Sequence, residues 1–284
     1  MTAVELNLRP VELLGLESDS NSSFLRGPAR APAAIRRVLD SGASNLCSEN
    51  GIDLARHPLF ARGHDHAIAD NESDFLGIEA IVAELLDRGG RPLILGGDHA
   101  VTYPVLRAIA ARHGPVSILH FDAHADIYQS FDDNRYSHAS PFARILEDGL
   151  AQQLVQVGIR TLNDHQRMQV ARYGVIVHEA RRLDLERVAD SIAAAPGPLY
   201  ISVDIDVLDP SCAPGVSHHE PGGMTVREVL GLVQSIRTPV AGADIVEYNP
   251  TRDINDMTAA VAVKLMKEIA AVMLSCHNGD AISA

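Results

Sequence analysis

The chain of 284 residues has no tryptophan, and only 4% of its residues are aromatic. Lys and Arg together number 24 against 37 Asp and Glu, which gives a formal net charge of -13. Proteins that bind nucleic acid present a broad basic face to the phosphates, and single strands also need aromatic rings on which bases stack. The composition therefore argues against a nucleic-acid partner.

The three cysteines, Cys47, Cys212 and Cys276, are odd in number and widely spaced. They form neither a disulfide framework nor a Cys-x-x-Cys metal pair, which favours a reducing compartment. No stretch approaches 18 consecutive apolar residues, and the first residues lack the basic and apolar segments of a secretory signal. From these absences we expect a cytoplasmic protein with no membrane partner.

What the chain does have is a regular alternation of short apolar runs and longer stretches of helical period. This alternation is typical of βαβ units, which build a parallel sheet with helices on both faces. Because no repeat or linker divides the chain, we predict an α/β fold: a single domain over residues 1–284 with three α/β/α layers and a mainly parallel sheet. The predicted strands are 11–16, 92–95, 116–121, 154–159, 175–177, 199–203 and 240–246, and the predicted helices include 75–86, 140–148, 226–236 and 257–274.

The segment 47–74 is polar and aperiodic, so we expect an irregular excursion from the sheet. His64 and His66 lie in this segment and are spaced like a pair of metal ligands. They are distant in sequence from the strand ends discussed below. We therefore expect both histidines to lie in a solvated loop.

Ligand-type side chains gather directly after three of the predicted strands. In open parallel sheets, ligands bind beyond the carboxyl ends of the strands. Alternate residues of an extended chain share a face, so side chains at i, i+2 and i+4 can converge on one point. His120 is out of phase with this pattern, and we expect a core histidine there. The candidates are His99 after the strand 92–95, Asp122, His124 and Asp126 after the strand 116–121, and Asp204 and Asp206 after the strand 199–203.

Four carboxylates in one place repel each other unless cations neutralise them, and two divalent cations cancel four negative charges. A shell of imidazole and carboxylate without thiolate favours Mn²⁺, with Co²⁺, Ni²⁺, Fe²⁺ and Zn²⁺ also suitable and Mg²⁺ less so. Paired ions can activate a bridging hydroxide and polarise an electrophile. The pattern therefore indicates a hydrolase with two metal ions.

Three motifs, Gly-Gly-Asp-His at 96–99, Asp-Ala-His-Ala-Asp at 122–126 and Ser-Val-Asp-Ile-Asp-Val-Leu-Asp-Pro at 202–210, resemble the signatures of the ureohydrolase family, the arginases and agmatinases. Their order and spacing also match, and the similarity extends over nearly the whole chain. Within the family, Asn-Ser-Ser-Phe-Leu at 21–25 and Ala-Pro-Gly-Val-Ser-His at 213–218 most resemble the plant-type arginases.

The resemblance implies roles for individual residues. Glu247 would receive the substrate guanidinium, since a carboxylate at a strand end can accept two parallel hydrogen bonds from that planar group. His138 would be the proton shuttle, a role that suits a group titrating near neutrality. Asp126 would also hydrogen-bond the bridging hydroxide and help to transfer its proton. One Mn²⁺ would be held by His99, Asp122, Asp126 and Asp204, and the other by Asp122, His124, Asp204 and Asp206.

For the far end of the substrate, the resemblance assigns residues less specifically. Asn134 and Ser137 fall in the loop that meets the amino-acid carboxylate in arginases, and Ser22 and Ser23 can reach the same end from the first loop. Thr161 and Asn163 lie where animal arginases keep aspartates for the α-amino group. Because this chain lacks those aspartates, agmatine and other guanidino compounds stay open beside arginine.

The resemblance thus implies hydrolysis of L-arginine to L-ornithine and urea, with agmatine to putrescine and urea as the alternative. Another guanidino compound would need the same metal-binding residues and different residues at the far end of the substrate. Two alternatives belong to other classes: an amide deacetylase on the same fold, which normally uses one ion, and a non-catalytic partner subunit. The family also implies two Mn²⁺ per subunit, with Ni²⁺ or Co²⁺ as substitutes, and a homotrimer or homohexamer.

Overall fold

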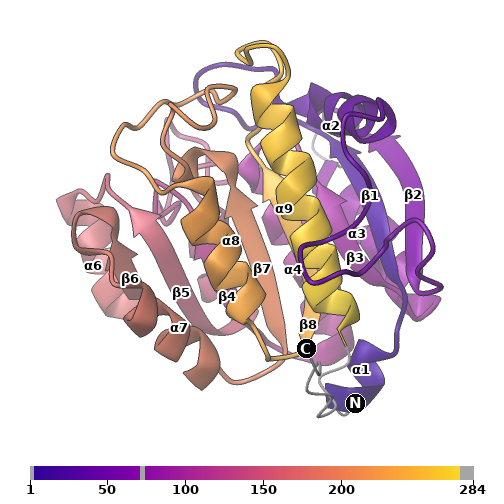
Figure 1. Ribbon diagram of the computed structural model, residues 1–284. Helices are drawn as coiled ribbons and strands as arrows, with labels where there is room; N and C mark the ends of the chain where they lie inside the picture. The colour runs from indigo at the N-terminus through magenta and orange to yellow at the C-terminus, as the bar shows by residue number, and fades with distance from the viewer. Residues whose placement is uncertain (1–2, 71–73, 276–284) are drawn as a thin grey trace.

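The computed structural model describes residues 3–70 and 74–275. Within these residues, eight strands form one sheet in the order β2-β1-β3-β8-β7-β4-β5-β6 (Figure 1), and every neighbouring pair is parallel. The predicted three-layer α/β fold is confirmed. The strands are β1 Val11–Glu17, β2 Phe60–Ala67, β3 Arg91–Leu95, β4 Val116–Phe121, β5 Ala151–Ile159, β6 Ile176–Glu179, β7 Leu199–Asp204 and β8 Val240–Val246.

Helices cover both faces of the sheet (Figure 1). One apolar layer packs against α2, α7, α8 and α9, and the other against α3, α4, α5 and α6. In the part of the chain that the structure describes, no helix is both long and apolar enough to span a membrane. The helices are α1 Ala3–Asn7, α2 Ala31–Asp40, α3 Asp74–Asp87, α4 Thr102–His113, α5 Pro141–Glu147, α6 Asp164–Tyr173, α7 Leu185–Ala194, α8 Val226–Ser235 and α9 Met257–Leu274.

The seven strands predicted from apolar runs are present, but the prediction for 47–74 is wrong in part. Residues Phe60–Ala67 form β2, which pairs with β1 at one edge of the sheet. None of its side chains is fully buried, so the strand carries no apolar run that could have revealed it. His64 and His66 therefore belong to an edge strand rather than to a loop.

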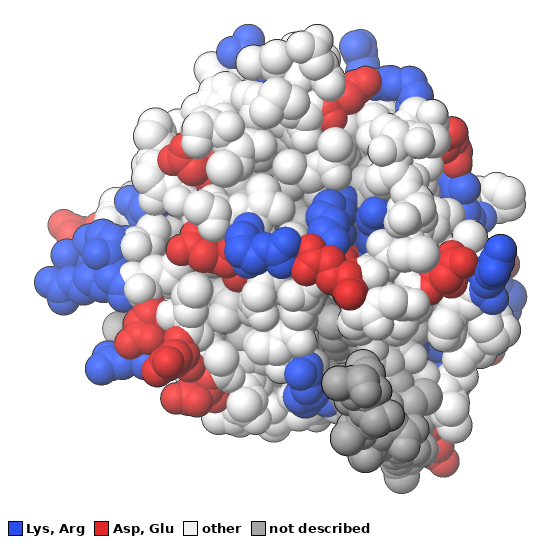
Figure 2. Space-filling model, in the orientation of Figure 1, with Lys and Arg blue, Asp and Glu red and all other residues white. Residues whose placement is uncertain are grey.

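The segment before β2 is fixed against α8 and α9 by ion pairs. Glu49 accepts hydrogen bonds from both terminal nitrogens of Arg227, each at 2.8 Å, and pairs with Lys264 at 3.0 Å. The space-filling view of the same face shows basic and acidic side chains interspersed among uncharged ones (Figure 2).

The order of the strands determines where functional side chains can meet. Strands β3, β8, β7 and β4 are neighbours in the middle of the sheet, although β8 is the last strand in sequence. Since all are parallel, their carboxyl ends lie along one edge. Asp204 is the last residue of β7, the other candidate metal ligands follow β3, β4 or β7, and Glu247 directly follows β8.

Candidate metal centre and active site

His99 is carried by a tight turn after β3. A Cβ atom at Gly97 would lie 1.6 Å from the backbone oxygen of Ser18, so only glycine allows the chain to pass this close to the first loop. The backbone nitrogen of Asp98 donates to the same Ser18 oxygen at 2.9 Å. The Asp98 side chain caps the 3₁₀ turn His99–Val101 by accepting from Ala100 N at 3.1 Å. The His99 side chain is fully buried.

The Nδ1 atom of His99 faces three carboxylates. It lies 3.0 Å from Asp126 Oδ2 and 3.2 Å from both Asp122 Oδ2 and Asp204 Oδ2. Burial opposes a charge on this ring, yet the three carboxylates raise the pKa of His99 well above its usual value. This nitrogen is buried and makes no hydrogen bond. A cation placed among these atoms would satisfy the nitrogen and the carboxylates together.

A second group lies beside the first and shares Asp122 with it. His124 Nδ1 is 2.9 Å from Asp206 Oδ2 and 3.4 Å from Asp122 Oδ1, whereas the other Asp122 oxygen faces His99. Asp122 therefore offers one oxygen to each group. Burial, together with repulsion from Asp206 and Asp122, raises the pKa of Asp204 well above its usual value. Buried carboxylates that repel each other in this way fit a pair of divalent cations.

A buried relay of hydrogen bonds fixes the ring of His99. Ser202 Oγ donates to Asp244 Oδ1 at 2.7 Å, while Tyr200 and Thr102 donate to Asp244 Oδ2 at 2.6 and 2.7 Å. Because Ser202 gives its one hydrogen to Asp244, it accepts from His99 Nε2 at 3.0 Å. In its neutral form the His99 ring therefore carries its proton on Nε2, and the Nδ1 lone pair points into the carboxylate group.

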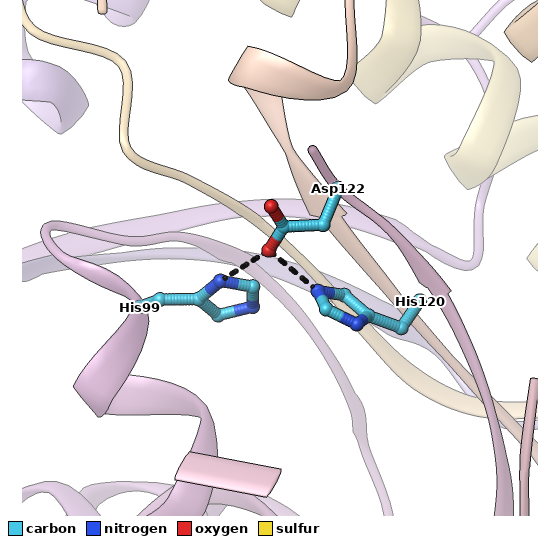
Figure 3. A group of neighbouring side chains, drawn as sticks. All are labelled: His99, His120 and Asp122. Atoms are coloured by element: carbon cyan, nitrogen blue, oxygen red, sulfur yellow. Dashed lines mark hydrogen bonds and ion pairs between the residues drawn. The ribbon is translucent and has the colours of Figure 1, made fainter. Parts of the chain in front are cut away.

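Asp122 is held from the other side by His120 (Figure 3). Gln156 Nε2 donates to His120 Nδ1 at 3.0 Å and to the backbone oxygen of Ala125 at 2.6 Å. His120 consequently carries its proton on Nε2, which donates to Asp122 Oδ2 at 2.7 Å. His120 is fully buried, as expected, and its position beside a ligand explains a histidine in the core of β4.

Glu247 and His138 form a buried ion pair beside this cluster. Glu247 has a left-handed backbone conformation, and its Oε1 atom accepts from His99 N and from His138 Nδ1, each at 2.8 Å. Burial opposes a charged ring at His138, but Glu247 raises the pKa of His138 to about 9. On its outer side, His138 Nε2 is hydrogen-bonded to Ser23 Oγ at 2.8 Å. A chain of polar atoms therefore connects Glu247 with the surface.

A cavity of about 190 Å³ opens onto these residues. It is lined by Asp126, Asp204, Asp206 and His124 together with Glu247 and His138. The other lining residues, called the rim below, are Ser23, Tyr128, Phe131, Ala139, Thr161, Gln166, His218 and Glu220.

The six predicted ligands, His138 and Glu247 thus come together, but of the separately predicted rim residues only Ser23 and Thr161 line the cavity. Ser22 donates to Asp98 at 3.3 Å, and Asn134 donates to Asn21 at 3.0 Å. Asn163 caps α6 and donates to the Tyr128 hydroxyl at 2.6 Å. Ser137 is buried away from the cavity lining. Contact of these four residues with substrate stays a prediction.

Sequence reasoning missed much of the rim. No periodicity marks Tyr128, Phe131 or Gln166. His218 also lines the cavity, where it contacts the rings of Phe24, His124 and His138. Glu220 itself lies more than ten residues after the end of β7, in the loop before α8, and over that distance the sequence pattern gives no orientation.

Comparison with known proteins identifies the family. Residues 9–272 match the model described as "Arginase family". The chain belongs to the arginase family. It is 44% identical to the mitochondrial arginase of Medicago truncatula over 92% of this chain and 81% of that protein. The solved structure of arginase from Medicago truncatula superimposes with a TM-score of 0.88 at 42% identity, covering 95% of this chain and 91% of that one.

Two further arginase-family relatives bear on the predictions. The chain is 43% identical to arginase 2 of Arabidopsis thaliana, described as chloroplastic/mitochondrial, over 92% of this chain and 80% of that protein. It is 38% identical to the N(1)-aminopropylagmatine ureohydrolase of Thermus thermophilus, over 89% of this chain and 87% of that protein. The expected cytoplasmic location is wrong, because the plant relatives carry mitochondrial or chloroplastic names that point to organelles.

Proposed function

We propose that this member of the arginase family hydrolyses L-arginine to L-ornithine and urea. The observation that carries the proposal is the convergence of two His/Asp groups that share Asp122 with a buried carboxylate, Glu247, on one cavity. The similarity to named arginases over most of the chain supports arginine as the substrate.

The residues fit two divalent cations, proposed to be Mn²⁺, with Ni²⁺ or Co²⁺ as substitutes. His99, Asp122, Asp126 and Asp204 would hold one ion, and His124 and Asp206 would hold the other together with Asp122 and Asp204. When bound, such a pair of ions supplies an activated water molecule for attack on the guanidinium carbon.

Glu247 is proposed to receive the guanidinium group. Its Oε1 atom is oriented by His99 N, and Oε2 accepts no hydrogen bond within the described residues. An entering guanidinium can therefore form two parallel hydrogen bonds with this carboxylate. Since His138 pairs with the same oxygen at 2.8 Å, substrate binding replaces one cationic partner of Glu247 by another.

His138 is proposed to carry protons between the solvent and the reacting atoms. Its Nδ1 faces the buried carboxylate, whereas its Nε2 meets the exposed hydroxyl of Ser23. A proton taken up at the outer nitrogen can be matched by one released at the inner nitrogen toward the leaving amine. Asp126, which lines the same cavity, is proposed to accept the proton of the attacking water.

Agmatine is the second candidate substrate, because the described residues that line the cavity include no Lys or Arg to meet an α-carboxylate. The Thermus relative is named for an agmatine derivative, which supports this alternative.

A one-metal amide deacetylase is disfavoured by two adjacent ligand groups, and a non-catalytic subunit is disfavoured by the presence of every ligand together with Glu247 and His138. As in the family, a homotrimer or homohexamer is proposed, which light scattering would detect as a multiple of 30.5 kDa.

The experiment is urea release by the Mn²⁺-loaded protein offered arginine, agmatine, guanidinobutyrate and guanidine in parallel. Turnover of arginine above the others supports the proposal, and preferred turnover of agmatine would replace it by the second candidate. Urea from none of the four, with two metal equivalents bound, would reject the proposal. The variant Glu247→Gln should lose about a thousandfold or more in kcat/KM while keeping both metals, because the guanidinium loses its charged partner.

A further inference from the structure

The rim of the cavity contains a single acidic residue, Glu220, and no Lys or Arg is among the described residues that line the cavity. We propose that Glu220 binds a cationic group at the far end of the substrate and so selects guanidino compounds that carry a second positive charge. The proposal deepens the proposed function, on which it rests for the position of the guanidinium at Glu247.

The backbone that presents Glu220 is fixed from two sides. Arg160 donates to the Glu220 backbone oxygen through Nε at 2.9 Å and through Nη2 at 2.6 Å. On the other side, Asp209 Oδ2 accepts from the nitrogens of Gly222 at 2.8 Å and Gly223 at 3.2 Å. Arg160 also donates to the backbone oxygen of Asp206 at 2.7 Å, so the rim and the ligand loop share one anchor. A carboxylate on such a support is pre-organised for a ligand.

The side chain of Glu220 is available to a ligand. Its carboxylate accepts no hydrogen bond from the described residues, and it is 40% exposed. Its one ion-pair partner among those residues is His124, whose Nε2 lies 3.8 Å from Glu220 Oε1. A carboxylate has four acceptor positions, so a contact with His124 leaves room for an ammonium group.

The cavity is therefore lined by two carboxylates in addition to the proposed metal ligands. Glu247 is buried, whereas Glu220 is 40% exposed and lies beside His124 Nε2, with Asp206 at the other nitrogen of that ring. A guanidinium held at Glu247 with an ammonium held at Glu220 matches both charges. A tail that ends in a carboxylate alone would meet Glu220 with a like charge, which is unfavourable in a partly desolvated cavity. Diamine-type guanidines and α-ammonium groups are thus favoured over guanidino acids.

The test uses a pair of ligands that differ in one group, agmatine and n-pentylguanidine, in which a methyl group replaces the terminal ammonium. The variant Glu220→Gln keeps the shape of the side chain and removes its charge. Glu186→Gln, on the exposed surface of α7, is the matched control for loss of one negative charge. Each protein is loaded with Mn²⁺, its metal content is measured, and kcat and KM are determined for both compounds and for arginine.

We expect Glu220→Gln to keep two metals and to lose about 10- to 100-fold in kcat/KM for agmatine and arginine, mainly through KM. Its kcat/KM for n-pentylguanidine should change less than about threefold, and Glu186→Gln should match the wild type. An equal loss on agmatine and n-pentylguanidine would overturn the proposal, as would loss of metal from Glu220→Gln. Such losses would assign Glu220 to the support of His124 instead.

The same ligand pair separates this proposal from the proposed function. If the wild type releases urea from none of the compounds, the proposed function fails, and calorimetric binding to the Mn²⁺-loaded proteins decides the role of Glu220. A stronger affinity of the wild type for agmatine than for n-pentylguanidine, lost in Glu220→Gln, supports the carboxylate as an ammonium site. Equal affinities for the two compounds in the wild type reject it.

Discussion

His99 and His124 hold corresponding places in the two halves of the metal centre, yet their surroundings differ. The inner half is His99 with Asp126 and Asp204, and although both carboxylates line the cavity, the His99 side chain is 0% exposed. The outer half, His124 with Asp206, borders the cavity, and the His124 side chain is 25% exposed. His99 is thus part of the protein core, whereas His124 is part of the wall of the cavity.

The second nitrogen of each histidine shows the same contrast. His99 Nε2 donates to Ser202, which donates to the buried Asp244. Among the described residues, His124 Nε2 makes no hydrogen bond, and its ion-pair partner is Glu220, 40% exposed, at 3.8 Å. Partners of this kind orient a ligating histidine and commonly change metal affinity by about 10- to 100-fold. We expect the inner half to be the more rigid site and to bind its ion more tightly.

The largest effects should come from removal of the ligands themselves. His124→Ala should keep one tightly held metal, whereas His99→Ala should lose its inner metal and weaken the outer one through the shared Asp122. Both variants should lose at least about a hundredfold in urea release, since each disrupts the activation of water. Metal content after dialysis against a chelator distinguishes them. Equal retention of metal by the two variants would erase the distinction between the halves.

The next effect isolates the relay without touching a ligand. Ser202→Ala removes the acceptor for His99 Nε2 and leaves Asp244 with one donor fewer. The affinity for the inner metal should fall about 10- to 100-fold, with the outer metal little changed. Titration of the metal-free protein against a competing chelator measures both affinities. An unchanged inner affinity would show that packing alone orients His99.

A pH effect of intermediate size is expected from the pair His138 and Glu247 in the metal-free protein. The pKa of His138 in the folded chain, about 9, lies above its usual value of 6.5. The pair therefore stabilises the fold fully below about pH 6.5, and this contribution, on the order of 1–3 kcal/mol, is lost as the pH rises through about 9. Denaturant unfolding at both ends of this range measures it. Glu247→Gln should remove most of the difference, and a wild-type stability that does not fall over this range would contradict the assignment.

The smallest effect should come from Tyr200→Phe. The Tyr200 hydroxyl donates to Asp244 Oδ2, but Thr102 donates to the same oxygen and Ser202 to the other. Because Asp244 keeps both remaining donors, the inner metal affinity should change less than about threefold, and stability should fall by about 1 kcal/mol. A loss as large as that of Ser202→Ala would show that the relay acts through the charge of Asp244 rather than through the orientation of His99.

The parts that sequence could predict are those with a short repeating pattern. The alternation of Asp122, His124 and Asp126 places three side chains on one face, and the buried strands β4 and β8 have the predicted bounds. The edge strand β2 carries no apolar pattern, because its side chains face solvent. The relay from His99 to Asp244 joins residues 103 and 42 positions apart, so only the packed sheet brings them together.

Most rim residues, Glu220 among them, could not be predicted from the sequence for a related reason. Glu220 is placed by Arg160, which lies 60 residues earlier and binds its backbone rather than its side chain. Such contacts depend on loop conformation and are not encoded in residue type. Glu247 became a candidate only through the family resemblance, since a single acidic residue after a strand is otherwise typical of the surface.

The position of β8 has a consequence for how an active molecule comes into being during synthesis. This strand is made last but lies between β3 and β7, so the sheet stays in two separate parts until β8 inserts. His99 belongs to one part, the aspartate ligands belong to the other, and Glu247 arrives with β8 itself. Pairings over such long sequence separations form late in folding. A nascent chain would therefore gain its metal centre and its activity in one final step, and incompletely folded molecules would release no urea.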